Sequence, residues 1–211
     1  MPQNSLSEPT IFVVDDDPSA LRAVCFLLEC NWRVEGFASA AEFLKAWSPD
    51  RPGCLLLDVR MPEMSGLELQ AALTKDGSCF PIIMMSGYGD VATCSQAFRA
   101  GAVDFLEKPA DHKVLLGRIQ EAVERDAKGR LAQAANPQFF ARLRGLTPRE
   151  REVMDRLIEG KSLKQIALEL NVSVQTSSKH RMKVLEKLRV ANDIELLKNL
   201  LQHPAIEAVP A

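Results

Sequence analysis

The fold is decided by the stretch IFVVDDD at residues 11–17, in which four apolar residues are followed by three acids. A second stretch, CLLLD at residues 54–58, repeats the pattern with one acid at its end. Short apolar runs of this kind predict buried parallel strands, and open α/β sheets place their sites at the carboxyl ends of such strands. If the two strands are neighbours, their carboxylates crowd together and need a cation, so a Mg²⁺-dependent acidic pocket is the first hypothesis.

Around these two strands, apolar runs alternate with amphipathic segments from Thr10 to about Ala127. Five repeats of strand then helix predict a doubly wound five-stranded parallel sheet covered on both faces, the flavodoxin-like α/β fold. Strands are expected near 11–15, 33–36, 53–58, 81–85 and 103–106, with helices near 18–30, 40–47, 66–75, 91–99 and 111–127.

After Leu146 the strand pattern disappears, and helix signals follow one another. The sequence TPRE at 147–150 combines an N-cap threonine, a proline at the first helical position and a glutamate at the third. Gly160 ends this helix, and Ser162 opens the next. A turn at 171–173 leads into a helix near 174–187, and Asp193 opens a last helix to about Gln202, so a small all-α four-helix domain with a helix-turn-helix is expected.

These patterns divide the chain into a domain at 10–127, a linker at 128–145 that continues the preceding helix for a turn or two, and a domain at 146–203. The ends, residues 1–9 and the tail from His203, are expected to be loose. Residues 11–127 carry 11 Lys/Arg against 18 Asp/Glu, whereas residues 128–203 carry 15 against 8. The two halves are therefore expected to have different partners, and the basic half favours nucleic acid.

Bulk composition is that of a soluble protein, with 46% hydrophobic residues and a net charge of −2. We expect a cytoplasmic protein with no membrane partner, because no apolar stretch approaches the roughly 18 residues of a membrane span and the N-terminus lacks a signal-peptide pattern. The cysteines form no metal or redox motif and are expected to be free thiols: Cys25, Cys30, Cys54, Cys79 and Cys94.

Polar residues stand at the carboxyl ends of four of the predicted strands, namely Asp15 and Asp16, Asp58, Ser86, and Lys108. A single acid at a strand end is usually a helix cap, as we expect for Asp17 before Pro18, but the whole set in this order resembles the receiver domain of two-component response regulators. The resemblance covers residues 10–127 and includes the motifs DVRMPEMSG at 58–66 and GAVDFLEKP at 101–109.

The resemblance implies that Asp58 is the phosphorylation site, a carboxylate nucleophile that takes a phosphoryl group from a sensor histidine kinase. Lys108 supplies a positive charge to the phosphoryl oxygens and Ser86 a hydroxyl. Mg²⁺ is the implied cofactor, and its implied ligands are Asp15, Asp16, Asp58 and the backbone carbonyl of Arg60.

Ser86 and Phe105 are implied to form the switch. When Asp58 gains phosphate, the Ser86 hydroxyl moves towards it and Phe105 turns inward, repacking the face on which receivers of this kind form homodimers. Lys108-Pro109 suggests a cis peptide bond. One departure is Ala110, where receivers commonly carry an aromatic residue, and it affects the expected dimer face more than the acceptor.

The helical half resembles the LuxR-type domain through LTPREREV at 146–153, KQIA at 164–167 and TSSKHR at 176–181. The resemblance implies that the helix at 174–187 enters the DNA major groove with its inner face formed by Val184, Leu185 and Leu188. Candidate contacts to base edges are Gln175, Ser178, Lys179 and Met182, and candidate contacts to phosphates are Thr176, His180, Arg181 and Lys183. At 177 and 178 the chain has two serines where relatives usually have an apolar and a longer polar residue, so the operator cannot be transferred from relatives.

Together the two halves resemble a NarL/FixJ-type response regulator, in which phosphorylation controls dimerisation and sequence-specific binding to promoter DNA. The alternative is a phosphorylated signalling adaptor or phosphate sink whose output helices bind protein, which the serine pair favours and the basic charge opposes. An enzyme is not expected, because no Ser/His/Asp or Glu-rich catalytic set occurs outside the receiver. The only turnover expected is slow autodephosphorylation of Asp58 in the receiver itself.

Overall fold

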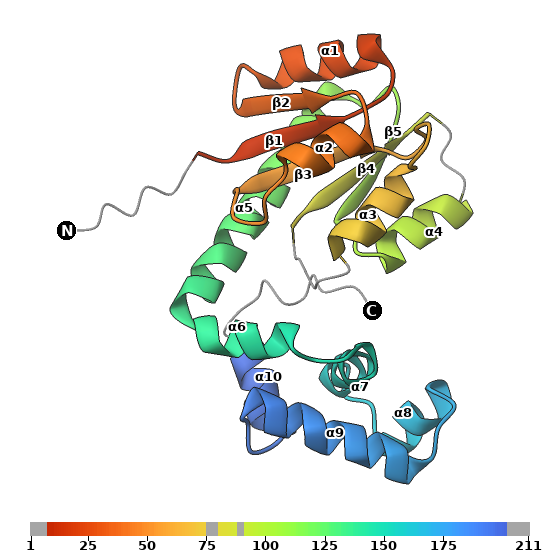
Figure 1. The fold of residues 1–211 in the computed structure, drawn as a ribbon, viewed down its shortest axis with the longest axis vertical. Helices are drawn as coiled ribbons and strands as arrows, with labels where there is room; N and C mark the ends of the chain where they lie inside the picture. Colours follow the sequence, from red (N-terminus) through yellow and green to blue (C-terminus); the bar gives the residue numbers. More distant parts are fainter. Residues whose placement is uncertain (1–7, 75–79, 88–90, 202–211) are drawn as a thin grey trace, which may run out of the picture. The chain divides into compact units, whose positions relative to one another are not determined.

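The computed structural model describes residues 8–74, 80–87 and 91–201, so the predictions for the extreme N-terminus, Cys79 and the tail from His203 fall outside it. The chain divides into two compact units, and the boundary between them lies near Lys128. Figure 1 shows the elements of both. The described cysteines are free, as expected.

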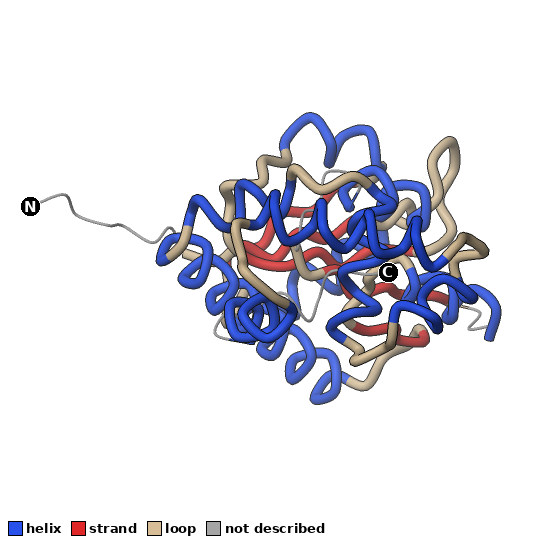
Figure 2. The backbone as a smooth tube through the Cα atoms, turned by 90° about the horizontal axis from the view of Figure 1, so that it is seen from below, coloured by secondary structure: helices blue, strands red, loops and turns tan. Residues whose placement is uncertain are grey.

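The first unit is a five-stranded parallel sheet in the order β2-β1-β3-β4-β5, which confirms the predicted doubly wound fold. Figure 2 shows the strands in red and the helices in blue. Its elements are β1 (Thr10–Val14), α1 (Pro18–Leu28), β2 (Arg33–Phe37), α2 (Ala40–Ala46), β3 (Gly53–Asp58), α3 (Gly66–Thr74), β4 (Ile82–Ser86), α4 (Val91–Arg99), β5 (Asp104–Glu107) and α5 (His112–Ala135).

Successive side chains of each strand point to opposite faces of the sheet, so alternate residues belong to two separate hydrophobic cores. Phe12 of β1 and Leu57 of β3 pack with α2, α3 and α4 on one face of the sheet. Ile11 and Leu56 pack with α1 and α5 on the other. Because β1, β3 and β4 are buried along their whole length, their sequences are almost continuous apolar runs. The acids at the ends of β1 and β3 therefore lie together at the carboxyl edge of the sheet.

The last helix of this unit is also fixed to the opposite edge of the sheet. Asp126 of α5 is buried, and its Oδ2 accepts a hydrogen bond from the backbone N–H of Gly53 at 2.8 Å. Gly53 begins β3 with φ near 140°, a conformation that disfavours other residues.

The second unit contains α6 (Pro137–Arg144), α7 (Pro148–Ile158), α8 (Leu163–Glu169), α9 (Val174–Leu188) and α10 (Asp193–Leu201). The capping box predicted at Thr147 and Glu150 is present. The core of the unit includes Val153, Ile166 and Val184, all without measurable exposure.

The predicted linker at 128–145 is largely helical, which is more structure than its sequence suggested. Helix α5 continues for two turns to Ala135, and α6 follows after one residue. Asn136 caps α6 and Pro137 occupies its first turn, so the residues that seemed to interrupt structure in fact start a helix. Phe139 and Leu143 of α6 are buried, and α6 packs on α9.

Candidate functional site

Two carboxylates from neighbouring strands lie at the carboxyl edge of the sheet. Asp58 is the last residue of β3, and Asp15 directly follows β1, the strand paired with β3 so that Val14 faces Leu57. Both side chains are buried. The sheet topology therefore brings together the two acids that the sequence places 43 positions apart.

Lys108 joins the two carboxylates. Its Nζ donates a hydrogen bond to Asp15 Oδ2 at 2.6 Å and another to Asp58 Oδ1. The lysine follows β5, its backbone N–H donates to the carbonyl of Ser86 at 2.7 Å, and its peptide bond to Pro109 is cis, as suggested. Ser86 ends β4 and is buried. The ends of four strands thus supply Asp15, Asp58, Ser86 and Lys108 to one place.

The other oxygens of the two acids are held by backbone amides. Asp58 Oδ2 accepts from Arg60 N–H at 2.7 Å, and Asp15 Oδ1 accepts from Asp17 N–H at 3.0 Å. Gly66 must lack a side chain, because a Cβ there would lie 2.1 Å from the Asp58 carbonyl oxygen. The loop after β3 is therefore drawn tightly over the acid, which fixes the orientation of its carboxylate.

Burial and the lysine act in opposite directions on this acid. Desolvation raises the pKa of Asp58, and the hydrogen bond and positive charge of Lys108 reduce that rise. For Lys108, desolvation lowers the pKa, but its hydrogen bonds and charge interactions with Asp15 and Asp58 outweigh this and raise it. The ammonium group of Lys108 therefore keeps its proton between the two carboxylates.

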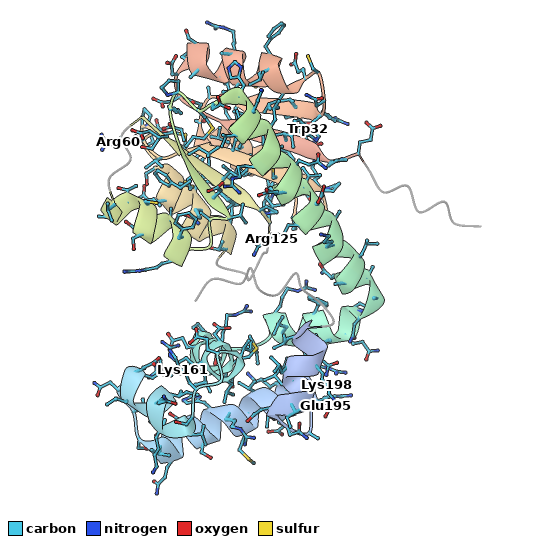
Figure 3. The ribbon with its side chains drawn as sticks, turned by 180° about the vertical axis from the view of Figure 1, so that it is seen from behind. Trp32, Arg60, Arg125, Lys161, Glu195 and Lys198 are labelled. Carbon is cyan, nitrogen blue, oxygen red and sulfur yellow. The ribbon has the colours of Figure 1, made fainter. Side chains whose placement is uncertain are left out.

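The donor set of the pocket fits Mg²⁺ bound partly through water. Asp15 and Asp58 offer carboxylate oxygens in the pocket, whereas Asp16 is exposed beside it and Arg60 is also exposed; Figure 3 labels Arg60 at the edge of its unit. No group of three acidic, histidine or cysteine side chains lies within metal-binding reach in the described ranges. Mg²⁺ commonly binds through one or two carboxylates and keeps several waters, so an all-oxygen site of this kind suits it.

The two predicted switch residues lie on adjacent strands. Ser86 is fully buried at the end of β4 and pairs with Glu107, two residues beyond Phe105 of β5. Phe105 is half-buried and packs against the core cluster that contains Ala97 of α4 and Ala102. The space around its ring is therefore set by α4 as well as by the sheet.

Helix α9 presents most of its predicted base-contacting side chains to solvent. Gln175 and Lys179 are exposed, Met182 is 63% exposed, and Ser178 is half-buried. Three large or long side chains spaced along the outer face of one helix are what major-groove recognition needs.

The predicted phosphate contacts are more varied. Lys183 is exposed, Thr176 Oγ1 shares a 2.8 Å hydrogen bond with Ser173, and Arg181 Nε pairs with Asp193 at 2.9 Å. His180 is half-buried, and its Nδ1 has no hydrogen-bond partner among the residues that the structure covers. Arg181 thus links α9 to α10 and reaches a phosphate only if it shares or leaves Asp193.

The inner face of α9 confirms the expected anchors Val184, Leu185 and Leu188, which are buried. Ser177 lies on the same face with 0% exposure, and its hydroxyl has no hydrogen-bond partner in the described part of the chain. The first of the two unusual serines therefore occupies a core position on the inner face of α9.

Sequence reasoning missed an ion pair that fastens α9 to α7. Lys187 Nζ donates to the buried Glu150 Oε2 at 2.6 Å. Desolvation raises the pKa of Glu150, but hydrogen bonds from Lys187 and from the N–H of Thr147 outweigh it, so the pKa is lowered. The capping box located Glu150, yet nothing in the sequence indicated its partner 37 residues later.

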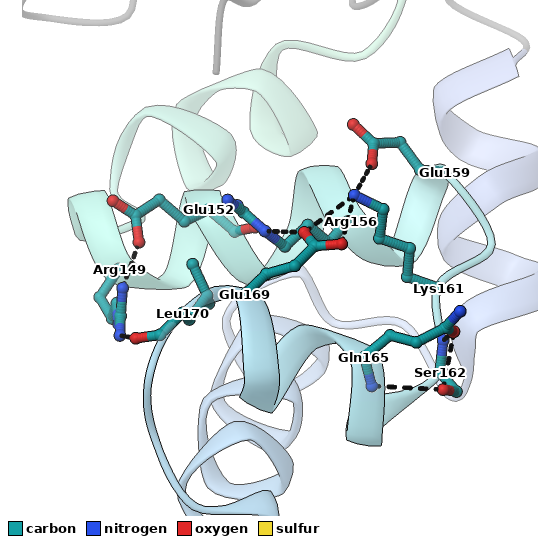
Figure 4. Close-up of polar contacts among 9 residues, drawn as sticks. All are labelled: Arg149, Glu152, Arg156, Glu159, Lys161, Ser162, Gln165, Glu169 and Leu170. Carbon is teal, nitrogen blue, oxygen red and sulfur yellow. Dashed lines mark hydrogen bonds and ion pairs between the residues drawn. The ribbon is translucent and has the colours of Figure 1, made fainter.

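A polar network fastens α8 to α7 (Figure 4). Arg156 Nε pairs with Glu169 at 3.0 Å, Lys161 pairs with the same acid at 2.8 Å, and Arg149 donates to the Leu170 carbonyl at 2.6 Å. These contacts hold the end of α8, and with it the turn that leads into α9. Figure 3 also labels Lys161 in this unit.

Asp155 of α7 is a half-buried acid with one oxygen cut off from solvent. This oxygen, Oδ2, makes no hydrogen bond within the described ranges. Desolvation raises the pKa of Asp155 to about 6, although the charges of Arg151 and Arg156 oppose the rise.

Two family models match the chain, one for each unit. The response regulator receiver domain matches residues 11–120, and the bacterial regulatory proteins of the luxR family match residues 144–199. In the described residues no helix is long and apolar enough to cross a membrane.

Curated relatives match along nearly the whole length. The transcriptional regulatory protein FixJ of Azorhizobium caulinodans is 37% identical over 204 residues, covering 95% of this chain and 97% of the relative. The response regulator protein TmoT of Ectopseudomonas mendocina is 38% identical over 192 residues, covering 90% and 87%.

Solved structures also match over nearly the whole chain. The response regulator StyR is 37% identical with a TM-score of 0.60, covering 93% of this chain and 100% of StyR. Full-length FixJ from B. japonicum is 36% identical with a TM-score of 0.55, covering 94% and 98%.

Proposed function

The chain belongs to the two-component response regulators that combine a receiver with a LuxR-type DNA-binding domain to regulate transcription, and from this we propose that Asp58 is its phosphoacceptor. The observation that carries the proposal is the buried Asp58 carboxylate, oriented by Arg60 N–H and hydrogen-bonded to Lys108. We propose the receiver at 10–127 and the DNA-binding domain at 146–203, joined by the helical segment between them.

In the proposed reaction a carboxylate oxygen of Asp58 attacks the phosphorus of a phosphohistidine on the cognate kinase, and the histidine nitrogen leaves. Lys108 then exchanges its contact with Asp58 for one with a phosphoryl oxygen while Asp15 continues to hold its Nζ. The Ser86 hydroxyl donates a second hydrogen bond to the phosphoryl group. Bound Mg²⁺, held by Asp15, Asp16, Asp58 and the Arg60 carbonyl, would neutralise charge on the transferring group.

The receiver then changes its surface and the DNA-binding domains pair. Movement of Ser86 towards the phosphoryl group frees space for Phe105 to turn inward, which alters the face that α4, β5 and α5 share. We propose that phosphorylated chains dimerise through this face and place two α9 helices on an inverted-repeat site. Gln175, Ser178, Lys179 and Met182 would contact bases, and Thr176, His180, Arg181 and Lys183 would contact phosphates.

Family membership favours operator DNA over protein as the ligand of the output helices, and a regulator over an enzyme. The only turnover we propose is slow hydrolysis of the Asp58 phosphate. We infer that the protein acts in the cytoplasm, where promoter DNA lies.

The test is the mass and oligomeric state of the full chain with Mg²⁺, before and after acetyl phosphate or beryllofluoride. Asp58→Asn should fold normally and lose the response. The wild type should gain one phosphoryl group from acetyl phosphate, or bind beryllofluoride without gaining one, and should shift from monomer to dimer with either reagent. Normal activation of Asp58→Asn would refute the assignment of Asp58, and a modified wild type that stays monomeric would refute only the dimerisation.

A further inference from the structure

Gln70 is a buried polar residue that the phosphoacceptor pocket does not use. It lies on α3 with 0% exposure, and its Nε2 donates a 2.9 Å hydrogen bond to the carbonyl of Ala97 on α4. The two helices cover the same face of the sheet, side by side in Figure 1. Gln70 therefore ties one helix to the backbone of the next.

The carbonyl that Gln70 contacts belongs to the last turn of α4. It also accepts a hydrogen bond from the backbone N–H of Ala102 at 3.0 Å, so both of its lone pairs are used. This bond closes the turn between α4 and β5, the strand that carries Phe105. The Gln70 amide thus holds in place the end of α4 and the first residues of the turn that leads to β5.

The other end of the same amide has no such partner. Gln70 Oε1 is buried and accepts no hydrogen bond within the described part of the chain. Reversing the amide would place Oε1 against the Ala97 carbonyl oxygen, where two acceptors repel, so the orientation is well determined by the contact itself. The unpartnered Oε1 costs free energy, so it offsets only part of the stability that the Nε2 hydrogen bond contributes to this arrangement.

The turn between α4 and β5 lies next to Phe105 on its inner side and next to exposed surface on its outer side. Ala97 and Ala102 belong to the apolar cluster against which Phe105 packs. Phe98, the next residue of α4, is 45% exposed on the outer surface. A shift of the Ala97 carbonyl would therefore change the space available to the Phe105 ring and the surface that Phe98 presents.

We propose that Gln70 is a positioning residue that holds the end of α4 in the arrangement in which Lys108 is bound to unmodified Asp58, and that this hydrogen bond is released when Phe105 repacks. The inference rests on the proposed function, because it assigns a residue to the same switch. The Gln70 amide stabilises only the arrangement in which Lys108 is bound to unmodified Asp58. Removing the amide therefore shifts the equilibrium towards the arrangement in which Phe105 has repacked.

The test is Gln70→Met in the full-length ¹⁵N-labelled protein with Mg²⁺, titrated with beryllofluoride and followed by NMR. Methionine keeps the length of the side chain and removes both polar atoms. Losing one net hydrogen bond should lower the half-saturating beryllofluoride concentration by about two- to tenfold. Thr74→Val is the matched control, because the Thr74 hydroxyl bonds the Gln70 carbonyl at 2.9 Å within α3 and does not reach α4.

Equal half-saturation in Gln70→Met and wild type, or weaker binding in the variant, would overturn the inference while leaving Asp58 as the acceptor. A wild type that takes up no beryllofluoride would instead refute the proposed function. A second measurement needs no variant: the Gln70 side-chain amide signals of the wild type should be protected from solvent exchange and should shift and lose protection at saturation. Unchanged signals and protection at saturation would also overturn the inference.

Discussion

Asp155→Asn should stabilise the DNA-binding unit at neutral pH. One oxygen of the Asp155 carboxyl is buried and the pKa is raised from 3.8 to about 6, so ionisation above pH 6 costs folding free energy. The difference between these two pKa values corresponds to about 3 kcal/mol of unfolding free energy. Because solvent reaches the half-buried side chain, we expect Asp155→Asn to raise the unfolding free energy by about 1–2 kcal/mol. Asparagine has the shape of the protonated acid and cannot ionise.

The sign of the effect sets a pH window for the assay. Well below pH 3.8 the carboxyl is protonated in both the folded and the unfolded chains, and the variant should match the wild type. As pH rises towards 6 the unfolded chain ionises first, so the wild type loses stability relative to Asp155→Asn, and above pH 6 the difference is constant. Subtracting the unfolding free energy of the wild type from that of the variant cancels the pH dependence contributed by the other acids. One of these is Glu150, whose lowered pKa makes stability fall as the pH falls.

Urea unfolding at pH 4, 5, 6 and 7 measures this difference in the intact protein. The tryptophans, Trp32 and Trp47, and the one tyrosine, Tyr88, all precede residue 128, so their fluorescence follows the receiver. Far-UV circular dichroism follows helices in both units, and the transition without a fluorescence counterpart belongs to the DNA-binding unit. A gain that is the same at every pH, or no gain at pH 7, would refute the account of Asp155 as a desolvated, ionised acid.

Three further predictions concern α9. Lys187→Met should lower the stability of the DNA-binding unit by about 2 kcal/mol, because it leaves Glu150 buried without its cation; Lys198→Met on α10 should change it little, and equal effects in urea unfolding would contradict this. Ser177→Val should raise stability by about 1 kcal/mol in the same assay by removing an unpaired buried hydroxyl, and a loss would show that the site has no room. Lys183→Ala should reduce the slope of log K against log salt by about 0.9 for promoter DNA, and an unchanged slope would exclude a phosphate contact.

Much of the fold could be predicted because its strands are encoded locally. Runs such as 11–14 and 54–57 are buried on both faces and read as uninterrupted apolar sequence, and the caps at Asp17 and Thr147 mark helix starts. The helix at 137–144 was missed because Asn136-Pro137 is as typical of a turn as of an N-cap. Only burial of Phe139 and Leu143 against other helices decides between them.

The acidic pocket could be predicted, because parallel strands bring the residues at their carboxyl ends to the same edge of the sheet. Individual side-chain contacts between residues far apart in the sequence could not be predicted. Lys108 was expected near Asp58 from the resemblance, but that its ammonium group also holds Asp15 is a result of packing. Lys187 with Glu150, Arg181 with Asp193 and Gln70 with Ala97 join residues whose spacing follows no helical or strand period. The roles of the site residues in phosphate transfer and DNA contact stay predictions.

The hydrogen bond between Asp126 and Gly53 has a consequence for how the protein is made. It joins positions 73 apart, and the Asp126 end lies on the helix that completes one core of the receiver. The ribosome must therefore release residue 126 before β3 receives its last contact, and until then a partly assembled parallel sheet has exposed edges that can pair with other chains. The helices after residue 137 contact one another over shorter stretches, so they are expected to fold quickly once synthesised. Slow translation before residue 126 should thus favour aggregation more than the same delay after it.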